Sequence, residues 1–174
     1  MISGYREISN PDTIVLDLDE TVCKAYVYSS DKLADLQAKV VDTNPMVFDV
    51  HFQDLTKVKF IICPRPGYRK FINNCYKNFK TVCVWTASAR EYAHEVVNIL
   101  FPVTPEIFYT RDDSINVRGS IHKDFHNLKR KLGNAHITMI DDKLENCISA
   151  DKYLHIRRYS PYARDTELHK FFDA

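Results

Sequence analysis

Acidic side chains follow two apolar segments of the sequence at the point where each segment ends. The segments are Thr-Ile-Val-Leu at 13–16 and Ile-Thr-Met-Ile at 137–140, and both have the β-branched composition of buried strands. The acidic residues that follow them are Asp17, Asp19, Asp141 and Asp142. In an open α/β sheet, ligands bind beyond the carboxyl ends of the strands, so neighbouring strands would bring four carboxylates into one crevice. Like charges at such short range stay ionised only beside a positive partner, which predicts a cation site.

Mg²⁺ is the cation that this donor set favours. It takes a few carboxylate oxygens, keeps several water ligands and is completed by a substrate phosphate. Beside such a metal, Asp17 is a candidate nucleophile, because an aspartate is already ionised at neutral pH and needs no base. Asp19 would protonate the departing oxygen and later deprotonate the water that opens the acyl phosphate. For that role Asp19 should present its backbone carbonyl, not its carboxylate, to the metal.

Two other residues are candidates for binding the phosphoryl group itself. Thr86 directly follows the apolar segment 80–85, and Lys123 lies at the start of a predicted helix at 123–132. A hydroxyl and an ammonium group that face the phosphoryl oxygens would offset their repulsion by the attacking carboxylate. The sequence therefore predicts a phosphoryl-transfer site.

Predicted strands alternate with predicted helices along most of the chain. The strands are the apolar segments 13–16, 80–85, 137–140 and 153–156, and the helices begin near Pro66, after Ser88, at Lys123 and at Thr166. Ser88 and Glu91 have the spacing of a capping box at the start of the second helix. This alternation predicts an α/β fold with a Rossmann-like, mainly parallel sheet flanked by helices.

The segment 24–63 interrupts this alternation, because it is too long for an ordinary connection between a strand and a helix. Apolar and polar residues alternate at 46–52 and again at 58–62, which predicts a β-hairpin inserted beside the main sheet. Leu33, Leu36 and Val40 indicate a short helix before it. We expect residues 1–174 to form a single domain that contains this insert.

The composition excludes several classes of function. With 24 basic and 23 acidic side chains the formal net charge is +1, so we expect no direct binding to nucleic acid. The five cysteines are odd in number and show no C-x-x-C spacing, which indicates reduced thiols in a nuclear or cytoplasmic protein. No signal peptide and no apolar segment long enough to cross a membrane is evident, so we expect a soluble protein. Its oligomeric state is not predicted.

Several motifs resemble those of a known family when they are taken in this order. They are DLDET at 17–21, PRPG at 64–67, WTAS and EYA within 85–93, RDDSINVRGSIHKDF at 111–125, IDD at 140–142 and DTEL at 165–168. This set resembles the haloacid dehalogenase (HAD) superfamily of phosphatases. The similarity is closer to its small C-terminal-domain phosphatase branch, which includes the TFIIF-associated, dullard-like and NLI-interacting-factor-like enzymes. Glu20 stands where much of the superfamily has glycine.

The resemblance implies a role for each matched residue. Asp17 would be the nucleophile and Asp19 the acid and base, while Thr86 and Lys123 would bind phosphate. Mg²⁺ would be held by Asp17, the Asp19 backbone and Asp142, with Asp141 close by. Arg65, Arg111 and Arg118 match basic residues near the family's substrate entrance. The expected partner is a phosphorylated protein or peptide, because family members act on phosphoserine or phosphothreonine, as the RNA polymerase II C-terminal-domain phosphatases do.

Two features depart from the family pattern. Lys143 and Leu144 follow Asp142 where the family usually has Ser-Pro or a similar small pair, and the insert matches poorly. Two alternatives keep the fold and change the function: a small-metabolite phosphatase, or a catalytically dead phosphopeptide-binding module.

A receiver domain is an alternative from another class, since it too combines acidic residues, a hydroxyl and a lysine around Mg²⁺. There the phosphorylated aspartate lies in mid-chain, with the acidic pair before it and the hydroxyl and lysine after it. Here the order is Asp17 and Asp19, then Thr86, then Lys123, then the second acidic pair. That order favours the phosphatase.

Overall fold

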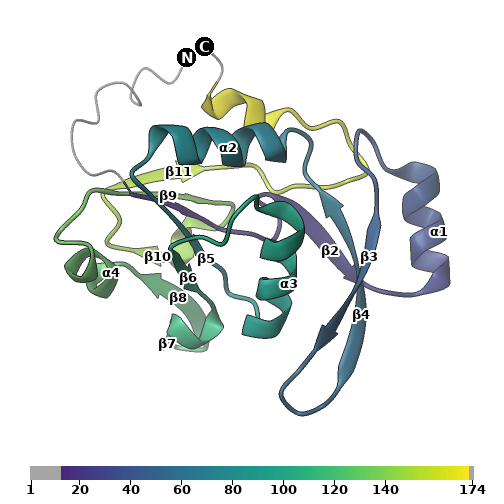
Figure 1. The fold of residues 1–174 in the computed structure, drawn as a ribbon, viewed down its shortest axis with the longest axis horizontal. Helices are drawn as coiled ribbons and strands as arrows, with labels where there is room; N and C mark the ends of the chain where they lie inside the picture. The colour runs from purple at the N-terminus through teal and green to yellow at the C-terminus, as the bar shows by residue number, and fades with distance from the viewer. Residues whose placement is uncertain (1–12, 173–174) are drawn as a thin grey trace.

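A five-stranded, fully parallel sheet forms the centre of the molecule (Figure 1). The structure is a computed structural model that describes residues 13–172. The strands are β1 (Thr13–Leu16), β5 (Thr81–Trp85), β6 (Ile107–Tyr109), β9 (Ile137–Asp141) and β11 (Lys152–His155), in the order β11-β9-β1-β5-β6. The predicted α/β class and its four strands are confirmed, and β6 is an additional strand at one edge.

Helices bury both faces of this sheet, which is why its strands are almost continuously apolar. On one face Ile14 and Leu16 pack with apolar residues of α2 (Tyr68–Asn78) and α3 (Arg90–Leu100). On the other face Val15 packs with Phe125 and with Leu128 of α4 (His126–Lys131). The side chains of β1 thus alternate between two cores, as the pleat of a strand requires.

The strand order places the predicted site residues at one edge of the sheet. β1 lies between β9 and β5, and Leu16 is in register with Ile140 of β9 and Val84 of β5. The chain leaves these three strands at Asp17, Asp141 and Thr86, so the three side chains start from neighbouring positions. The parallel arrangement alone therefore brings together residues that are far apart in the sequence.

The insert forms a separate antiparallel sheet beside the main one. Its strands are β2 (Cys23–Val27), β3 (Met46–His51) and β4 (Lys57–Pro64), in the order β2-β4-β3, and α1 (Ser30–Lys39) connects β2 with β3. The Ser29 side chain caps α1 by accepting a hydrogen bond from the Lys32 backbone N–H at 3.0 Å. The predicted hairpin and short helix are confirmed, and β2 adds a third strand. The β3–β4 hairpin extends away from the central sheet (Figure 1).

The helix predicted at 123–132 is wrong at its start, because residues 120–124 form a strand of a third, small sheet. This sheet has the strand order β10-β8-β7, with β7 at Ile115–Val117, β8 at Ser120–Asp124 and β10 at Cys147–Ile148. Of the predicted helix only the short α4 forms. Lys123 therefore lies on a strand, in register with Cys147, and not at a helix start. Local propensity could not predict this pairing, because the partner strand is more than twenty residues away in the sequence.

The remaining elements are short 3₁₀ helices. They are η1 (Arg111–Asp113), η2 (Leu144–Asn146) and η3 (Glu167–Phe171), and η3 replaces the predicted terminal α-helix. All five cysteines carry free thiols, and four of them are buried. Within residues 13–172, no helix combines the length and the apolar character that crossing a membrane requires.

Candidate active site

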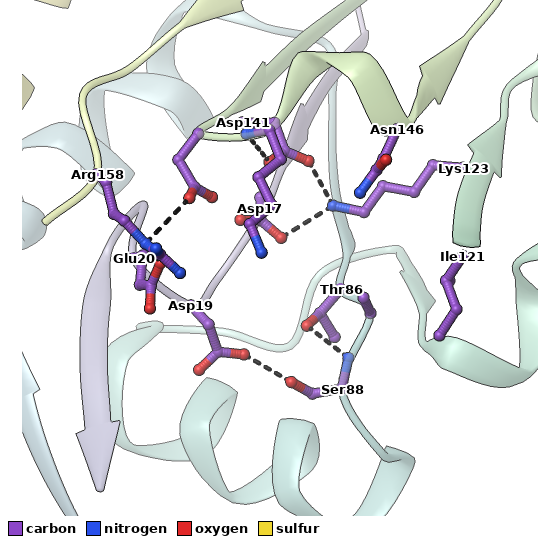
Figure 2. Close-up of a pocket in the computed structure, with 13 residues that line it drawn as sticks. Asp17, Asp19, Glu20, Thr86, Ser88, Ile121, Lys123, Asp141, Asn146 and Arg158 are labelled. Atoms are coloured by element: carbon purple, nitrogen blue, oxygen red, sulfur yellow. Dashed lines mark hydrogen bonds and ion pairs between the residues drawn. The ribbon is translucent and has the colours of Figure 1, made fainter. Parts of the chain in front are cut away.

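A cleft of about 180 Å³ opens beyond the carboxyl ends of β1, β5 and β9 (Figure 2). Its acidic lining residues are Asp17, Asp19, Glu20, Asp141 and Asp142. Its basic lining residues are Lys123, Lys143 and Arg158, and Thr86, Ser88 and Asn146 are among the others. The structure thus brings together six of the residues that the sequence singled out, namely Asp17, Asp19, Thr86, Lys123, Asp141 and Asp142.

A buried lysine links two of the carboxylates. The Lys123 ammonium donates to Asp17 Oδ1 at 2.9 Å and to Asp141 Oδ2 at 2.6 Å, and all three residues are buried. The Thr21 hydroxyl donates to the other Asp17 oxygen at 3.0 Å. These contacts fix the Asp17 carboxylate at the centre of the cleft, as Figure 2 shows.

Three carboxylates at the base of the cleft form a group with the dimensions of a metal site. Asp17, Asp141 and Asp142 each offer an oxygen, and these oxygens lie within 4.8 Å of one another. Lys123 supplies one buried positive charge against the three carboxylates. An oxygen-only donor set with excess negative charge fits a hard divalent cation such as Mg²⁺. The Asp19 carboxylate is not part of this group.

Asp19 is instead held by two hydroxyl groups from the start of α3. Ser88 Oγ donates to Asp19 Oδ2 and Tyr92 Oη donates to Asp19 Oδ1, each at 2.6 Å. The predicted capping box is therefore wrong, because α3 begins at Arg90 with Ala89 as its N-cap and without a side-chain cap. The Ser88 hydroxyl does not cap α3 but donates its hydrogen bond to the Asp19 carboxylate. Asp19 thus points away from the group of three carboxylates and toward Ser88 (Figure 2).

Thr86 lines the cleft from the end of β5. It is buried at the end of β5, where its backbone N–H donates to the Tyr109 carbonyl at 3.0 Å. Its Oγ accepts the Ser88 backbone N–H at 3.1 Å, which leaves the hydroxyl hydrogen available to donate into the cleft. Thr86 and Lys123 therefore border the Asp17 carboxylate from β5 and from β8.

The comparisons with known proteins agree with this geometry. The model of the NLI interacting factor-like phosphatase family matches residues 12–173. The chain belongs to this family. The cleft at the carboxyl ends of β1, β5 and β9 is therefore its candidate active site.

Solved structures with the same fold include two of Fcp1, an RNA polymerase II CTD phosphatase. One Fcp1 structure has a TM-score of 0.57 and 20% sequence identity, over 82% of this chain and 42% of that chain. A fission yeast Fcp1 variant bound to beryllium fluoride has a TM-score of 0.57 and 18% identity, over 91% of this chain and 48% of that chain. This chain thus spans less than half of either Fcp1 chain. Curated protein sequences give no match.

Arg65 does not lie where the family resemblance suggested. It is fully buried, and its guanidinium makes a bidentate ion pair with Asp165 at 2.9 and 2.8 Å. The guanidinium also donates to the backbone carbonyls of Glu20, Thr21 and Arg157. These contacts hold the loop that follows Asp19 against the C-terminal segment. The structure therefore makes Arg65 a support of the site, not part of the cleft lining.

Two other basic residues suggested by the resemblance also lie outside the cleft lining. Arg118 is exposed in the turn between β7 and β8, where its φ is 52°. Arg111 is exposed and donates to the Ala87 carbonyl at 3.0 Å.

Arg158 lines the cleft although sequence reasoning did not single it out. It follows β11 by three residues, and its Nε contacts Glu20 and lies 4.0 Å from Asp142 Oδ2. The available signal was position, since Arg158 comes shortly after the carboxyl end of a strand that neighbours β9.

Glu20 adopts a backbone conformation that favours glycine. Its φ of 65° lies in the left-handed region, where a residue with a side chain is strained by about 1–2 kcal/mol. The side chain is buried and forms ion pairs with Lys24 and Arg158. The conformation explains why glycine suits this position. The glutamate adds two charged contacts beside the cleft.

Burial sets the charge state of the central carboxylate in the absence of a metal. Removal from water raises the pKa of Asp17 from its ordinary value of 3.8 to about 8, and the charge of Lys123 offsets this only in part while Asp141 adds to it. Burial and the neighbouring Asp141 also raise the pKa of Asp142. A cation bound among these carboxylates would favour their ionised forms and lower both pKa values.

The raised pKa of Asp17 predicts that Mg²⁺ stabilises the protein more at higher pH. Without metal, the folded chain holds a proton on Asp17 between about pH 4 and pH 8 that the unfolded chain releases, so the stability from this group is lost progressively as pH rises from about 4 to about 8. Mg²⁺ binds the ionised form and competes with that proton. We expect the Mg²⁺-induced rise in melting temperature to be larger at pH 8 than at pH 6. An equal rise at both values would contradict the assignment.

Proposed function

We propose that this protein is a Mg²⁺-dependent phosphoserine/phosphothreonine protein phosphatase that acts through an aspartyl-phosphate on Asp17. The observation that carries the proposal is the buried Asp17 carboxylate, bound by Lys123 at 2.9 Å and grouped with Asp141 and Asp142 within 4.8 Å. Membership of a phosphatase family supports it. The likeness in fold to two structures of Fcp1 supports it as well. Fcp1 is described as an RNA polymerase II CTD phosphatase, and the structure of the fission yeast protein contains bound beryllium fluoride.

The first half of the reaction would transfer the phosphoryl group to the protein. An oxygen of Asp17 attacks phosphorus, and the bond between phosphorus and the substrate oxygen breaks. Asp19 donates its proton to the departing serine or threonine oxygen, which leaves as a hydroxyl group. Lys123 and the Thr86 hydroxyl bind the phosphoryl oxygens and stabilise the charge that they carry in the transition state.

The second half would return the protein to its starting state. Asp19, now ionised, accepts a proton from a water molecule that attacks phosphorus, and the bond between phosphorus and Asp17 breaks. Inorganic phosphate leaves, and Asp19 is protonated again. The Ser88 and Tyr92 hydroxyls would hold the Asp19 carboxylate at the cleft side of α3 during both steps.

The residues present fit a Mg²⁺ ion. Asp17 and Asp142 would hold it through their carboxylates and Asp19 through its backbone carbonyl, with Asp141 kept nearby by Lys123. When bound, the ion supplies positive charge that offsets the repulsion between the carboxylates and a phosphate dianion.

The open shape of the cleft favours a protein substrate over a small metabolite. Its lining residues come from segments 17–20, 86–88, 121–123, 141–146 and 158, and the insert at 24–63 contributes none of them. The described part of the insert thus stands beside the site and does not close over it. A phosphorylated side chain on a large partner can therefore approach, whereas a small-metabolite enzyme gains from enclosing its substrate.

Metal removal tests the proposed chemistry. We expect the wild-type protein to hydrolyse p-nitrophenyl phosphate with added Mg²⁺, to lose this activity in excess EDTA and to regain it when Mg²⁺ is restored. Phosphate release from phosphoserine and phosphothreonine peptides, compared with release from sugar phosphates, tests the substrate class. Activity that persists in EDTA would reject the mechanism, and brisk hydrolysis of sugar phosphates without peptide turnover would favour the small-metabolite enzyme.

A further inference from the structure

We propose that Arg158 and Lys143 form a cationic rim that binds a second negative charge on the substrate, close to the phosphorylated residue. The proposal deepens the proposed function and rests on it, because it specifies which phosphopeptides the site takes. The preferred substrate would carry an acidic side chain or a second phosphate beside the residue that is dephosphorylated.

The Arg158 guanidinium is held in place but remains accessible. Its side chain is 62% exposed, and its Nε contacts Glu20 and lies 4.0 Å from Asp142. Neither Nη1 nor Nη2 donates a hydrogen bond to a residue that the structure describes. A guanidinium that is anchored at Nε keeps these two donors for a bidentate contact with a carboxylate or phosphate. The anchor is itself fixed, because Glu20 is buried and also binds Lys24.

Lys143 adds a second cation to the lining of the same cleft. It directly follows Asp142, and its backbone N–H donates to Asp141 Oδ1 at 2.8 Å, which fixes the start of its side chain at the mouth of the site. The side chain is exposed, and no ion pair joins it to any residue of the described range 13–172. The side chain thus adds a positive charge to the lining of the cleft.

The distribution of charge favours an acidic flanking group over a basic one. The base of the cleft is negative, and its charge is directed at the metal and the transferred phosphoryl group, with Lys123 buried among the carboxylates. The exposed cations of the cleft are Arg158 and Lys143, at its rim. An additional anion on the substrate would meet them without entering the base of the cleft. Such exposed contacts are weakened by salt, so the preference should fall as ionic strength rises.

Binding to an inactive variant tests the rim without depending on turnover. Asp17→Asn protein with saturating Mg²⁺ is titrated against three fluorescent phosphoserine peptides of equal length, whose flanking residues are glutamate, glutamine or lysine. We expect the acidic peptide to bind about tenfold more tightly than the neutral one at low salt. Adding Arg158→Gln and Lys143→Gln together should reduce this ratio to near one. Adding Arg158→Glu alone should shift the preference toward the lysine peptide.

The control is Arg164→Gln in the same background. Arg164 is an exposed arginine paired with Asp42 and lies outside the cleft lining, so its loss should leave the ratio unchanged. The ratio compares the acidic and the neutral peptide on the same protein, so a general loss of affinity or stability does not alter it. Equal binding of acidic and neutral peptides, or a ratio that survives the Arg158 and Lys143 substitutions, would overturn the rim.

The outcome also separates the rim from the proposed function. If wild-type protein hydrolyses the phosphopeptides but shows no acidic preference, the rim is wrong and the phosphatase stands. If acidic phosphopeptides bind through the rim and none is hydrolysed, the rim is correct and the chain is a binding module.

Discussion

Asp17→Asn is expected to lower kcat/KM for p-nitrophenyl phosphate by roughly 10,000-fold or more, the scale on which removal of a covalent nucleophile acts. The amide keeps the shape of the side chain and can still accept from Thr21, but it cannot form the acyl phosphate. It also removes one carboxylate from the group of Asp17, Asp141 and Asp142. Stopped assays with phosphate detection measure the loss.

The same substitution should leave the metal-free protein folded. Burial raises the pKa of Asp17 to about 8, so at pH 7 without metal the group is largely protonated and asparagine is close to its neutral form. Lys123 retains Asp141 as a partner at 2.6 Å. We therefore expect a melting temperature near that of wild type without Mg²⁺, and a smaller rise when Mg²⁺ is added. Near-wild-type hydrolysis by the folded variant would exclude Asp17 as the nucleophile.

Asp165→Asn is expected to lower the free energy of unfolding by about 3–5 kcal/mol, since it leaves the charge of Arg65 buried without a counterion. Burial by itself would raise the pKa of Asp165. The two hydrogen bonds from Arg65 and the positive charge of Arg65 outweigh burial, so the pKa of Asp165 lies below its ordinary range. A typical domain has a total stability of about 5–15 kcal/mol, so the loss would be large. Urea denaturation at pH 7 measures it.

The double variant Arg65→Met with Asp165→Asn separates the ion pair from general packing. Removing both charges avoids the uncompensated cation, so part of the stability should return. Asp35→Asn is the matched control, because Asp35 is only half-buried, pairs with the exposed Lys39 and accepts from Tyr162, so its loss should change stability much less. A loss from Asp165→Asn no greater than that from Asp35→Asn would show that the buried pair contributes nothing particular.

Arg65 also connects this stability to the active site. Its guanidinium donates to the carbonyls of Glu20 at 3.3 Å and Thr21 at 2.9 Å, directly after the two candidate catalytic aspartates. The Tyr159 backbone N–H donates to the same Glu20 carbonyl at 2.9 Å. We infer that the C-terminal segment fixes the loop between β1 and β2, so a variant that loosens it would misplace Asp19.

The sequence by itself determined the features that depend on neighbouring residues. Apolar, β-branched segments bounded by polar residues indicated β1, β5 and β9, and the ends of these strands placed Asp17, Thr86 and Asp141 at one edge. This prediction needed only the alternation of strands and helices, because parallel strands have their carboxyl ends at the same side of a sheet. The hairpin of the insert followed from its period of two in the same way.

The tertiary structure decided the rest, because those contacts join segments that no local pattern relates. Lys123 reaches Asp17 from a strand that exists through its pairing with Cys147, whereas its local sequence favoured a helix start. Ser88 has the spacing of a helix cap, yet its hydroxyl binds Asp19. A lone hydroxyl or cation takes whichever partner lies within hydrogen-bond reach, and the fold alone sets which groups come that close.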